Sequence, residues 1–478
     1  MFFFCNCLEI GRSEKTNGFV LSFTRFALLL QKNTATMEIS ELYHLYLKCG
    51  QQLTTDSRNC PQGSIFLALK GTSFDGNKFA ANALEKGCAY AVVDEKEYVP
   101  EGDSRYILVD DTLTTYKELA REHRRQFSFP VIGITGTNGK TTTKELISAV
   151  LAKKYHVVHT EANYNNDVGV PRTLLTFRPE HEIAVVEMGA SHPGDIRKLV
   201  DYVEPTCGLI TNVGRAHLQG FGSFEGVKRT KGELYDFLAA HDALLFLNSG
   251  DPDLLEMAGQ RNFQKVVSYA SGGADHEAVV TGSVQSCTPF LNFSWQSGLH
   301  TPSASQEYEV RSQLIGAYNI NNMLAAIAVG LYFDVEPTLI CEALRDYVPS
   351  NNRSQLTVTK DNRLVVDAYN ANPTSMKAAL ENFRLIDGDH KMVILGDMLE
   401  LGEASATEHQ RIVDLLKTMD FETVWLVGDE FGKTDGSFRK FHNVDEVKAC
   451  IAADKPRGRY ILIKGSNGSK LWQLPEIL

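Results

Sequence analysis

The sequence predicts an α/β protein of three domains, whose central domain is a doubly wound, mostly parallel sheet with a phosphate-binding loop. Three observations predict this fold class. Short apolar runs alternate with helical stretches along most of the chain, as in parallel sheets covered by helices. A turn rich in glycine and threonine, at 131–143, joins one apolar run directly to helix-forming residues. The length of 478 residues suffices for about two to four domains with cores of their own.

Residues 1–36 are expected to lie outside the folded domains. Arg12 and Arg25 interrupt their apolar segments, which are too short to span a bilayer. Met37 begins a stretch typical of a natural start, in which Ser40 is able to cap the helix that follows. We therefore expect a translation-start artefact or a disordered extension before Met37, and no stable membrane insertion.

The first domain, 37–127, contains two short apolar runs suited to buried strands, at 64–69 and 89–93. The stretch between them, 80–86, has helical composition. Alternation of this kind predicts an α/β unit with at least partly parallel pairing. A charged helix end at 121–127 closes the domain.

The second domain, 128–346, begins with the phosphate-binding loop. Further buried strands, with helices between them, are expected at 183–187, 207–211 and 243–247. Ligands of such a sheet sit beyond the carboxyl ends of its strands. The polar, β-rich stretch 266–313 is expected to form an antiparallel appendage, and 316–330 an Ala-rich helix.

The third domain, 347–478, repeats the alternation of strands and helices. Its strands are expected at 363–367, 391–395, 423–427 and 460–463. This pattern predicts a second nucleotide-fold unit, of Rossmann-like type.

The loop at 131–143 reads Val-Ile-Gly-Ile-Thr-Gly-Thr-Asn-Gly-Lys-Thr-Thr-Thr. From Gly133 its pattern is G-x-x-G-T-x-G-K-T. It differs from the strict G-x-x-x-x-G-K-S/T pattern because Ile134 occupies the place of the first glycine. The apolar run before it and the helix formers after it provide the strand–loop–helix context that phosphate binding requires.

The residue types in this loop suit the phosphates of a nucleotide. Gly136 and Gly139 let the backbone approach an anion, and the N–H groups that open the helix point at it. Lys140 adds a movable positive charge, and the Thr141 hydroxyl is placed to ligate Mg²⁺. We therefore predict that the loop binds a nucleoside triphosphate, through Gly136, Thr137, Asn138, Gly139, Lys140, Thr141 and Thr142.

Three further residues are candidates for the same site. Glu187 ends a predicted buried strand, so its carboxylate needs a partner, either Mg²⁺ or a structural salt bridge. His217 follows another such strand in a Gly-flanked loop, and this place favours a metal role over an ordinary surface or core histidine. Lys231, by composition alone, is predicted to be a solvated helix lysine.

Charge and cysteine content exclude some classes of protein. The net charge of −11 argues against nucleic acid as the main partner, because such binding needs clustered lysine and arginine. The nine cysteines are scattered and form no C-x-x-C spacing. This distribution predicts reduced thiols in a cytoplasmic protein rather than a zinc site or a disulfide framework.

Five motifs follow one another along the chain: Gly133-Ile-Thr-Gly-Thr-Asn-Gly-Lys-Thr141, Val186-Glu-Met-Gly189, Asn212-Val-Gly-Arg-Ala-His217, Lys231-Gly-Glu233 and Gly316-Ala-Tyr-Asn-Ile-Asn-Asn-Met-Leu-Ala-Ala326. In this order they resemble the Mur ligases, ATP-dependent enzymes that add amino acids or a dipeptide to the peptidoglycan precursor. The resemblance covers essentially all of 37–478.

The resemblance implies roles that composition does not. It implies catalytic roles for Lys140, Lys231 and His217, and metal ligands at Thr141, Glu187, His217 and Lys231. In the family the lysine matching Lys231 is carbamylated by carbon dioxide and becomes a metal-ligating anion.

The resemblance also places residues around ATP. Asn319 is expected to contact the adenine, to cap the Ala-rich helix, or to do both. Arg353 is expected at the phosphates and Asp367 at the ribose hydroxyls. Asn352 stands where the family usually has glycine before that arginine.

The first domain resembles the uridine-diphosphate-binding domain of two branches of the family. The similar segments are Thr55-Asp-Ser-Arg58, Gly63-Ser-Ile-Phe-Leu-Ala-Leu-Lys-Gly71 and Asp75-Gly76. Ser57 and Arg58 are the expected substrate-binding residues, with Arg58 and the loop backbone at the pyrophosphate. The resemblance further implies substrate contacts at Asn165 and Asn166.

The third domain distinguishes between these branches. Tyr369-Asn-Ala-Asn-Pro-Thr-Ser-Met376 and Gly396-Asp-Met-Leu-Glu-Leu-Gly402 are similar to the members that add D-alanyl-D-alanine. The Asp-Asn-Pro-Arg signature expected of a ligase for meso-diaminopimelate is absent from the sequence. Lys464-Gly-Ser466 resembles a shared motif, but Asn467 replaces the arginine expected next.

The resemblance therefore implies an ATP- and Mg²⁺-dependent ligase, which we expect to be a cytoplasmic monomer. The charge and the short apolar segments exclude nucleic acid as the main partner and stable membrane insertion. It would join D-alanyl-D-alanine to UDP-N-acetylmuramoyl-tripeptide through an acyl phosphate. The alternatives are the third-residue-adding ligase, a folylpolyglutamate-type ligase and a P-loop NTPase switch. The segment Thr55–Arg58 argues against the folate type, and a switch has no need for Glu187, His217 and Lys231 beside two further domains.

Overall fold

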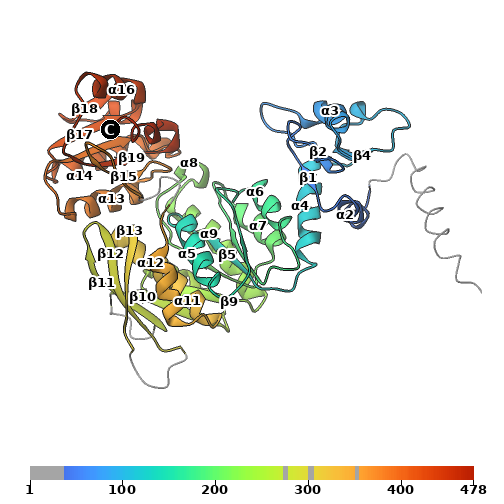
Figure 1. The fold of residues 1–478 in the computed structure, drawn as a ribbon, viewed down its shortest axis with the longest axis horizontal. Coiled ribbons are helices and arrows are strands. Elements are labelled where there is room, and N and C mark those ends of the chain that lie inside the picture. Colours follow the sequence, from blue (N-terminus) through green and yellow to red (C-terminus); the bar gives the residue numbers. More distant parts are fainter. Residues whose placement is uncertain (1–36, 273–277, 300–305, 350–354) are drawn as a thin grey trace, which may run out of the picture. The chain divides into compact units, whose positions relative to one another are not determined.

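The computed structural model describes residues 37–272, 278–299, 306–349 and 355–478 (Figure 1). The chain divides into two compact units, one ending at Glu122 and the other spanning His123–Leu478. The predicted extension 1–36 lies outside the described residues. Within the described ranges, no helix combines the length and the apolar character needed to cross a bilayer.

The first unit contains a four-stranded sheet in which every neighbouring pair is parallel. Its strands in spatial order are β1 (Leu53–Thr54), β2 (Ile65–Leu67), β3 (Tyr90–Val93) and β4 (Tyr106–Leu108). The predicted strands β2 and β3 and the helix between them, α3 (Ala80–Glu85), are confirmed. The predicted cap at Ser40 is wrong, because α2 (Ile39–Lys48) already begins one residue earlier, after Glu38.

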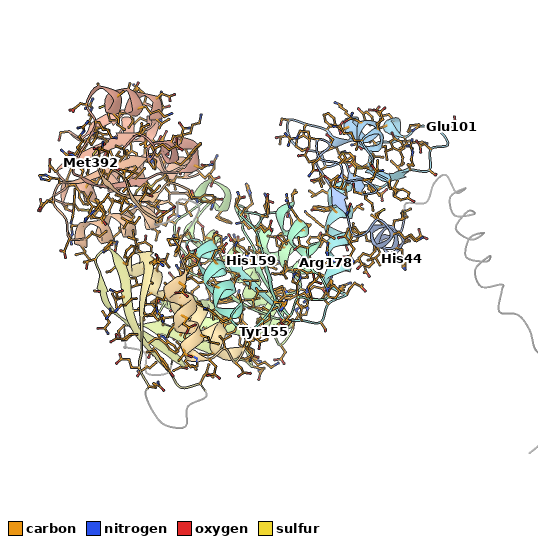
Figure 2. The ribbon with its side chains drawn as sticks, viewed as in Figure 1. His44, Glu101, Tyr155, His159, Arg178 and Met392 are labelled. Carbon is orange, nitrogen blue, oxygen red and sulfur yellow. The ribbon has the colours of Figure 1, made fainter. Side chains whose placement is uncertain are left out.

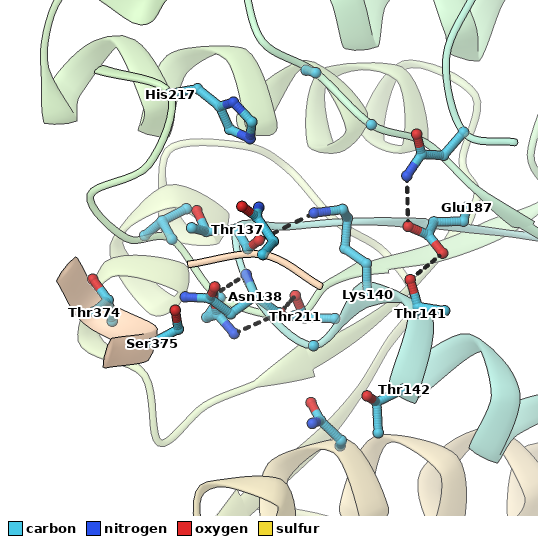
Figure 3. A pocket seen from close by; sticks show the side chains of 18 of the residues that line it. Thr137, Asn138, Lys140, Thr141, Thr142, Glu187, Thr211, His217, Thr374 and Ser375 are labelled. Atoms are coloured by element: carbon cyan, nitrogen blue, oxygen red, sulfur yellow. Dashed lines mark hydrogen bonds between the residues drawn. The ribbon is translucent and has the colours of Figure 1, made fainter. Parts of the chain in front are cut away.

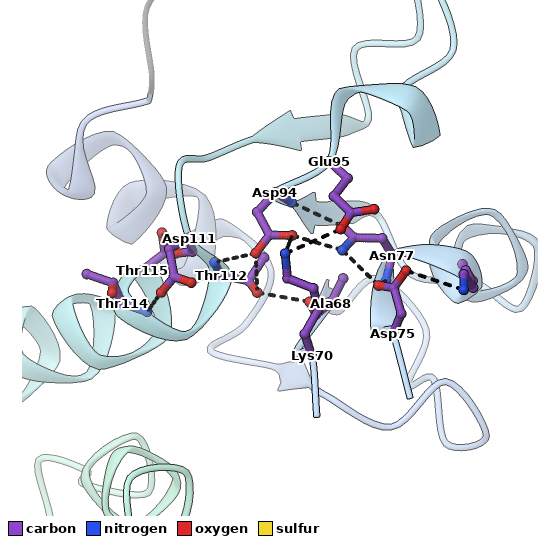
Figure 4. Close-up of polar contacts among 11 residues, drawn as sticks. Ala68, Lys70, Asp75, Asn77, Asp94, Glu95, Asp111, Thr112, Thr114 and Thr115 are labelled. Atoms are coloured by element: carbon purple, nitrogen blue, oxygen red, sulfur yellow. Dashed lines mark hydrogen bonds and ion pairs between the residues drawn. The ribbon is translucent and has the colours of Figure 1, made fainter. Parts of the chain in front are cut away.

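A buried carboxylate, Asp94, joins three segments of the first unit just after β3 (Figure 4). It accepts hydrogen bonds from the Asn77 side chain at 2.8 Å and from the backbone and hydroxyl of Thr112 at 3.1 Å each. The Lys70 ammonium lies 3.1 Å away. Burial opposes the charged form, but these hydrogen bonds and Lys70 outweigh it and hold the pKa of Asp94 below its ordinary value.

Asp94→Ala is expected to destabilise the first unit by about 2–4 kcal/mol, because it leaves buried donors without their acceptor. The loss is measured as a lower midpoint of urea unfolding, and faster hydrogen exchange in β2 and β3 shows that it lies in the first unit. Since the pKa of Asp94 is lowered in the folded state, the difference from wild type is largest above the ordinary carboxyl pKa of about 3.9 and shrinks as the pH falls. Glu95→Gln, which removes only the more exposed partner of Lys70, is the control. Equal stability of Asp94→Ala and wild type would contradict the interpretation.

The second unit contains a nine-stranded sheet in the order β13-β12-β11-β10-β9-β8-β5-β7-β6. The strands in chain order are β5 (Val131–Thr135), β6 (Val157–His159), β7 (Ile183–Glu187), β8 (Cys207–Ile210), β9 (Leu244–Asn248), β10 (Val266–Ser271), β11 (Val280–Cys287), β12 (Phe290–Ser297) and β13 (Tyr308–Ile315). The predicted central strands are thus confirmed. Every residue of β5, β7, β8 and β9 is buried, because helices cover both faces of this sheet.

Helices flank this sheet on both faces, and Figure 2 draws the side chains between the layers. On one face, α5 (Lys140–Leu151), α11 (Ile320–Tyr332) and α12 (Pro337–Asp346) share a continuous apolar core with the strands. Against β5 and β8 lie α7 (Asp195–Val203) and α9 (Phe224–Ala240), which also contact each other. The carboxyl ends of the parallel strands therefore open between the two helical layers, where a doubly wound sheet binds its ligands.

The stretch predicted to be an antiparallel appendage is instead a continuation of the main sheet. β10 pairs with β9 in parallel and β11 pairs with β10 in parallel, whereas only β11–β12 and β12–β13 are antiparallel. Without β10 and β11 the edge of β9 would expose unpaired backbone groups, and the added strands satisfy them.

The same unit contains a second sheet of six strands, in the order β14-β15-β19-β16-β17-β18. The strands are β14 (Gln355–Val358), β15 (Arg363–Asp367), β16 (Lys391–Gly396), β17 (Thr423–Val427), β18 (Arg439–Phe441) and β19 (Tyr460–Lys464). The pairing is parallel except at β14, and the four predicted strands are confirmed. The helices α13 (Pro373–Leu385) and α14 (Ser405–Lys417) pack on one face, and α16 (Val444–Ala453) packs on the other.

Candidate functional site

A cavity of about 840 Å³ lies at the carboxyl ends of β5, β7 and β8 (Figure 3). Its wall includes the predicted phosphate loop from Thr137 to Thr142, whereas Gly136 is not among the residues that line it. Other predicted site residues that line it are Asn165, Asn166, Glu187, His217, Asn319 and Asp367. Both sheets of the second unit contribute side chains to the wall, since Asp367 ends β15.

The phosphate loop depends on two glycines with left-handed backbone. Gly136 has φ +143°, and a Cβ atom there would lie 2.0 Å from the Thr211 hydroxyl. Gly139 has φ +78°, and its Cβ would lie 2.7 Å from Asn322. Gly139 also immediately precedes α5, so its flexibility lets the chain turn into the helix. The N–H groups at the start of α5 therefore face the cavity and form an anion site.

Lys140 lies over its own loop. Its ammonium donates to the carbonyls of Gly136 at 2.8 Å and Thr137 at 3.1 Å (Figure 3). The charge is thus held where phosphate groups would enter, on hydrogen bonds that an anion can replace. The role of Lys140 at the phosphates stays a prediction.

Asn138 anchors the loop to two other segments. Its backbone N–H donates to the Asn212 side chain at 3.0 Å, and its carbonyl accepts from the Thr211 hydroxyl at 2.6 Å. Its side-chain oxygen accepts at 2.7 Å from Asn372, the residue that caps α13. The loop is therefore fixed from the end of β8 and from the second sheet's domain.

Glu187 is the buried acid at this edge of the sheet, with 1% of its surface exposed. One carboxylate oxygen accepts from the Thr141 hydroxyl at 2.9 Å and the other from the Asn165 amide at 2.7 Å. These partners are neutral donors, so the salt bridge considered for Glu187 is not what fixes its side chain. Asn165, predicted to bind substrate, orients Glu187 in this structure.

The donor set fits Mg²⁺. Thr141 and Glu187 present hard oxygen atoms side by side, and Mg²⁺ in proteins commonly takes one or two carboxylates together with phosphate oxygens and water. Among the described residues no three His, Cys, Asp or Glu side chains form a metal-sized cluster. Thr141 and Glu187 thus have the residue types for part of a magnesium shell.

His217 lies at the cavity wall on the residue before α8 (Leu218–Phe221) and has φ +49°. Its Nδ1 faces the carboxylate of Glu400, from the loop after β16. The contact with His217 holds the pKa of Glu400 below its ordinary value despite partial burial. The structure thus places His217 at the site but does not bring it together with Glu187 as a preformed pair of ligands.

Lys231 is not the solvated lysine that composition predicts. It lies on α9 with 2% of its surface exposed, and its ammonium lies 5.6 Å from the centre of the Phe221 ring. Burial, and secondarily the positive charge of Lys140, lower the pKa of Lys231 well below its ordinary value. The charges of Lys140, Asp195 and Glu187 all affect the pKa of Lys231. Lys231 itself is not among the residues that line the cavity.

Asn319 precedes α11 and lines the cavity, but the predicted cap is wrong. Its amide donates to the Ile315 carbonyl at 2.8 Å, and its oxygen accepts from Asn322 at 2.8 Å rather than from a helix N–H. The Asn322 oxygen in turn accepts from Thr143 on α5 at 3.0 Å. This relay fixes the start of α11 against the phosphate-loop helix.

Asp367 forms the other edge of the cavity together with a buried lysine. Asp367 on β15 is the direct partner of Lys464 on β19. The Lys464 ammonium, whose side chain is 1% exposed, donates to Asp367 Oδ2 at 2.5 Å and to the Asn370 carbonyl at 3.3 Å. One carboxylate oxygen is thus occupied, which leaves Oδ1 for a ligand. Arg353, expected at the phosphates, lies outside the described residues.

Lys464→Met is expected to raise the KM for ATP about tenfold with a smaller effect on kcat, because Asp367 loses the cation that orients it. Steady-state kinetics at varied ATP measure this split. The KM for ATP of the double variant with Asp367→Asn should be no higher than that of the more impaired single variant. Both substitutions disrupt the same ion pair, so their effects should not add. Lys433→Met, at an exposed lysine on the same domain, is the control. An unchanged KM for ATP would contradict this role.

Three further predicted residues have local roles in this structure. The Asn166 oxygen accepts from the backbone N–H groups of Val168 and Gly169 and so fixes the start of α6 (Gly169–Leu174). In the first unit, Arg58 forms a two-pronged ion pair with Asp56, at 2.9 and 2.8 Å, and is largely exposed. The Ser57 carbonyl accepts from Lys86 at 2.8 Å. Substrate binding by Ser57 and Arg58 remains a prediction.

Several cavity residues were missed by the sequence reasoning. They are Asn163, Asp167, Ser191, His192, Asp195, Asn248 and Asp251. Other cavity residues lie in segments that the sequence had singled out, although no role was assigned to them individually: Thr211, Asn212, Asn322, Tyr369, Asn370, Thr374, Ser375 and Lys464. Most of the missed residues follow a buried strand directly or within a few residues. A polar residue just beyond an apolar run is therefore the sequence pattern that would have predicted them. It has to be searched for after every strand of the sheet, not only at the phosphate loop.

A glycine loop at a helix start, a lysine over it and a threonine–glutamate pair at the next strand define a P-loop nucleotide-binding α/β protein. Comparisons with known proteins specify the family. The Mur ligase family, catalytic domain matches residues 51–124, the Mur ligase middle domain matches 134–330, and the Mur ligase, glutamate ligase domain matches 352–467.

Most of the chain is similar to named ligases. It is 34% identical over 438 residues to the UDP-N-acetylmuramoyl-tripeptide--D-alanyl-D-alanine ligase of Bacillus subtilis (strain 168), covering 89% of this chain and 92% of that protein. The crystal structure of MurF from Acinetobacter baumannii matches with a TM-score of 0.79 and 28% identity, over 91% of this chain and 98% of that one. MurF ligase from Thermotoga maritima in complex with ADP matches with a TM-score of 0.78 and 26% identity, over 89% and 96%. The chain belongs to the Mur ligase family.

Proposed function

We propose that this protein is an ATP-dependent ligase that joins D-alanyl-D-alanine to UDP-N-acetylmuramoyl-tripeptide, with release of ADP and phosphate. The observation that carries the proposal is the cavity in which the phosphate loop meets the Thr141–Glu187 pair and Asp367, in a chain related over nearly its whole length to a ligase of that name. The ADP bound by the Thermotoga maritima relative supports ATP as the nucleotide.

The reaction needs charge to be neutralised more than it needs covalent chemistry from the protein. The tripeptide carboxylate attacks the γ-phosphorus of ATP, the bond from that phosphorus to the β–γ bridging oxygen breaks, and ADP leaves. The product is an acyl phosphate. Lys140 and the N–H groups at the start of α5 face the phosphates and stabilise the charge that spreads over the transferred group.

Mg²⁺ is the proposed metal cofactor. Thr141 and Glu187 would hold it, because their oxygen atoms already lie together at the cavity wall. When bound there, the ion supplies charge neutralisation at the phosphate oxygens. His217 is proposed to serve a second metal position through its ring, with Glu400 orienting the imidazole from the other side.

Carbamylation of Lys231 is part of the proposal, and the burial of this residue supports it. Carbon dioxide reacts only with the neutral amine of a lysine, and burial favours the neutral form of Lys231 at ordinary pH. The resulting carbamate would carry a negative charge, which the nearby Lys140 would stabilise. Two carbamate oxygens would then be available to a hard cation.

The substrates are assigned by segment. Tyr369–Met376 and Gly396–Gly402 are proposed to select the dipeptide, since both segments resemble the members that add D-alanyl-D-alanine, and Tyr369 and Ser375 line the cavity. Ser57 and Arg58 are proposed to hold the uridine diphosphate, and Asn165 and Asn166 to contact the peptide end. We further propose a cytoplasmic monomer without a nucleic-acid partner.

A coupled assay tests the function. Phosphate release is measured with ATP, UDP-N-acetylmuramoyl-tripeptide and D-alanyl-D-alanine, and then with each of the three omitted. Release should require all three. Release that continues without either peptide substrate would indicate an NTPase switch and would overturn the proposal.

A further inference from the structure

His192 is a cavity residue to which the proposed function has so far assigned no role. It lies in the loop between β7 and α7 and is exposed at the cavity wall. The Asp195 carboxylate accepts hydrogen bonds from the backbone N–H groups of Ser191 at 3.0 Å and His192 at 2.8 Å. The same Asp195 contributes to the electric field at Lys231. Asp195 therefore fixes the backbone of the loop that carries the His192 side chain.

The His192 ring is also held in place. Its Nδ1 lies 3.1 Å from the Ser191 hydroxyl. The first turn of α8 packs behind it, so closely that a Cβ atom on Gly220 would lie 3.3 Å from the ring carbon Cδ2. In the tautomer in which Nδ1 carries the proton, Nδ1 donates a hydrogen bond to the Ser191 hydroxyl. Nε2 is then left as a proton acceptor.

Amide formation, which rests on the proposed function, requires such an acceptor. The α-amino group of a dipeptide has a pKa of about 7.7–8.0, so near pH 7 it arrives mostly as an ammonium and cannot attack a carbonyl. A base with a pKa near the working pH is best suited to remove the proton. An imidazole, at about 6.5, meets this requirement, whereas a carboxylate, at about 3.9–4.3, is too weak a base.

Four other titratable residues of the wall have contacts of their own, and the remaining carboxylates, Asp167 and Asp195, are bases of the weaker kind. Both oxygens of Glu187 accept hydrogen bonds, and Asp367 is paired with Lys464. Asp251 caps α10 (Pro252–Gly259). His217, the second histidine among the described residues of the wall, faces Glu400 and is proposed to serve a metal.

We propose that His192 is the general base that accepts a proton from the ammonium of the incoming dipeptide. Nε2 takes one proton, the freed lone pair attacks the acyl carbonyl carbon, and a C–N bond forms. The tetrahedral adduct then collapses as the bond from carbon to the phosphate oxygen breaks. Phosphate leaves with that electron pair, and the second amine proton leaves with it, so the product is a neutral amide.

The charges around His192 are compatible with this role. The negative groups near it are Asp195 from α7, whose carboxylate accepts from the His192 backbone N–H, and Glu400 from the loop after β16. His192 adds to the lowering of the Glu400 pKa, for which the contact with His217 is the larger cause. α8, with the sequence Leu-Gln-Gly-Phe, brings no titratable side chain to the contact.

The test separates the two halves of the reaction. His192→Gln and the control His156→Gln, at an exposed histidine that is not among the residues lining the cavity, are compared with wild type. Amide formation is measured with D-alanyl-D-alanine near pH 7. Acyl phosphate formation is measured by replacing the dipeptide with hydroxylamine, which is already neutral at that pH and traps the acyl group as a hydroxamate.

His192→Gln should lose about 100-fold in amide formation near pH 7 and keep the wild-type rate of hydroxamate formation. The loss should shrink near pH 9, because the dipeptide amine is then neutral without help. Normal amide formation in His192→Gln, or an equal loss of hydroxamate, would overturn the role of His192. A wild-type protein that makes no hydroxamate would instead contradict the proposed acyl phosphate, so the two failures are distinguishable.

Discussion

Lys140→Ala is expected to abolish ligation, with a loss of about 3 kcal/mol or more in transition-state stabilisation, or roughly 100-fold or more in kcat. The ammonium of Lys140 lies over the phosphate loop, on the carbonyls of Gly136 and Thr137. Removing it leaves the negative charge of the transferred phosphoryl group without its movable counter-charge. Single-turnover formation of ADP, measured at saturating substrates, reports this step directly.

The fold should survive this substitution, because Lys140 is half-buried at the cavity wall and its ammonium donates to carbonyls of its own loop rather than packing in the core. The melting temperature of Lys140→Ala should therefore match wild type. Lys153→Ala, at a lysine paired with acidic residues of α12, is the matched control and should remain active. Near-normal turnover in Lys140→Ala would remove the phosphate-loop assignment.

Lys231→Ala should nearly eliminate activity. As an unmodified lysine, Lys231 would add a positive charge close to Lys140, which burial makes unfavourable. As a carbamate, it would add a negative charge and two oxygens for a hard cation. Acetate or another short carboxylic acid, titrated into Lys231→Ala, should partly restore turnover by filling the vacated space.

Lys228→Ala is the matched control, because Lys228 lies on the same helix but pairs with Asp253 and Glu256 on α10. It should keep near wild-type turnover and show no response to acetate. Mass spectrometry of the intact protein under carbon dioxide, after trapping of the carbamate, identifies the modification itself. Full activity of Lys231→Ala would defeat the carbamate hypothesis.

The elements that local sequence determines were predictable. The phosphate loop could be predicted because glycine, lysine and threonine stand in a fixed order between an apolar run and helix formers. The strands of the parallel sheets were found because they are buried on both faces and read as continuous apolar runs. The relation of β10 and β11 to the main sheet was missed, since a strand's neighbours are set by tertiary packing and not by its own composition.

Contacts between distant segments explain the remaining misses in the site. Lys464 meets Asp367 only because β19 pairs with β15, across 97 residues of chain. Asn372 reaches Asn138 across 234 residues. Lys231 was predicted to be solvated because charged residues surround it in the sequence of its helix. Its burial follows from the packing of α9 against α7 and α8. Asn319 has the residue type of a cap, but the side-chain oxygen that would accept from a helix N–H accepts from the Asn322 amide instead.

The central claim is that this chain lengthens a tripeptide precursor by a dipeptide, and the mass of the product tests it most directly. The protein is incubated with ATP, both UDP-N-acetylmuramoyl-dipeptide and UDP-N-acetylmuramoyl-tripeptide, D-alanyl-D-alanine, lysine and diaminopimelate. The tripeptide precursor should gain the mass of D-alanyl-D-alanine less one water, with one ADP formed for each product, while the dipeptide precursor stays unchanged. Extension of the dipeptide precursor by a diamino acid, with the tripeptide precursor left intact, would contradict the claim and identify a third-residue ligase.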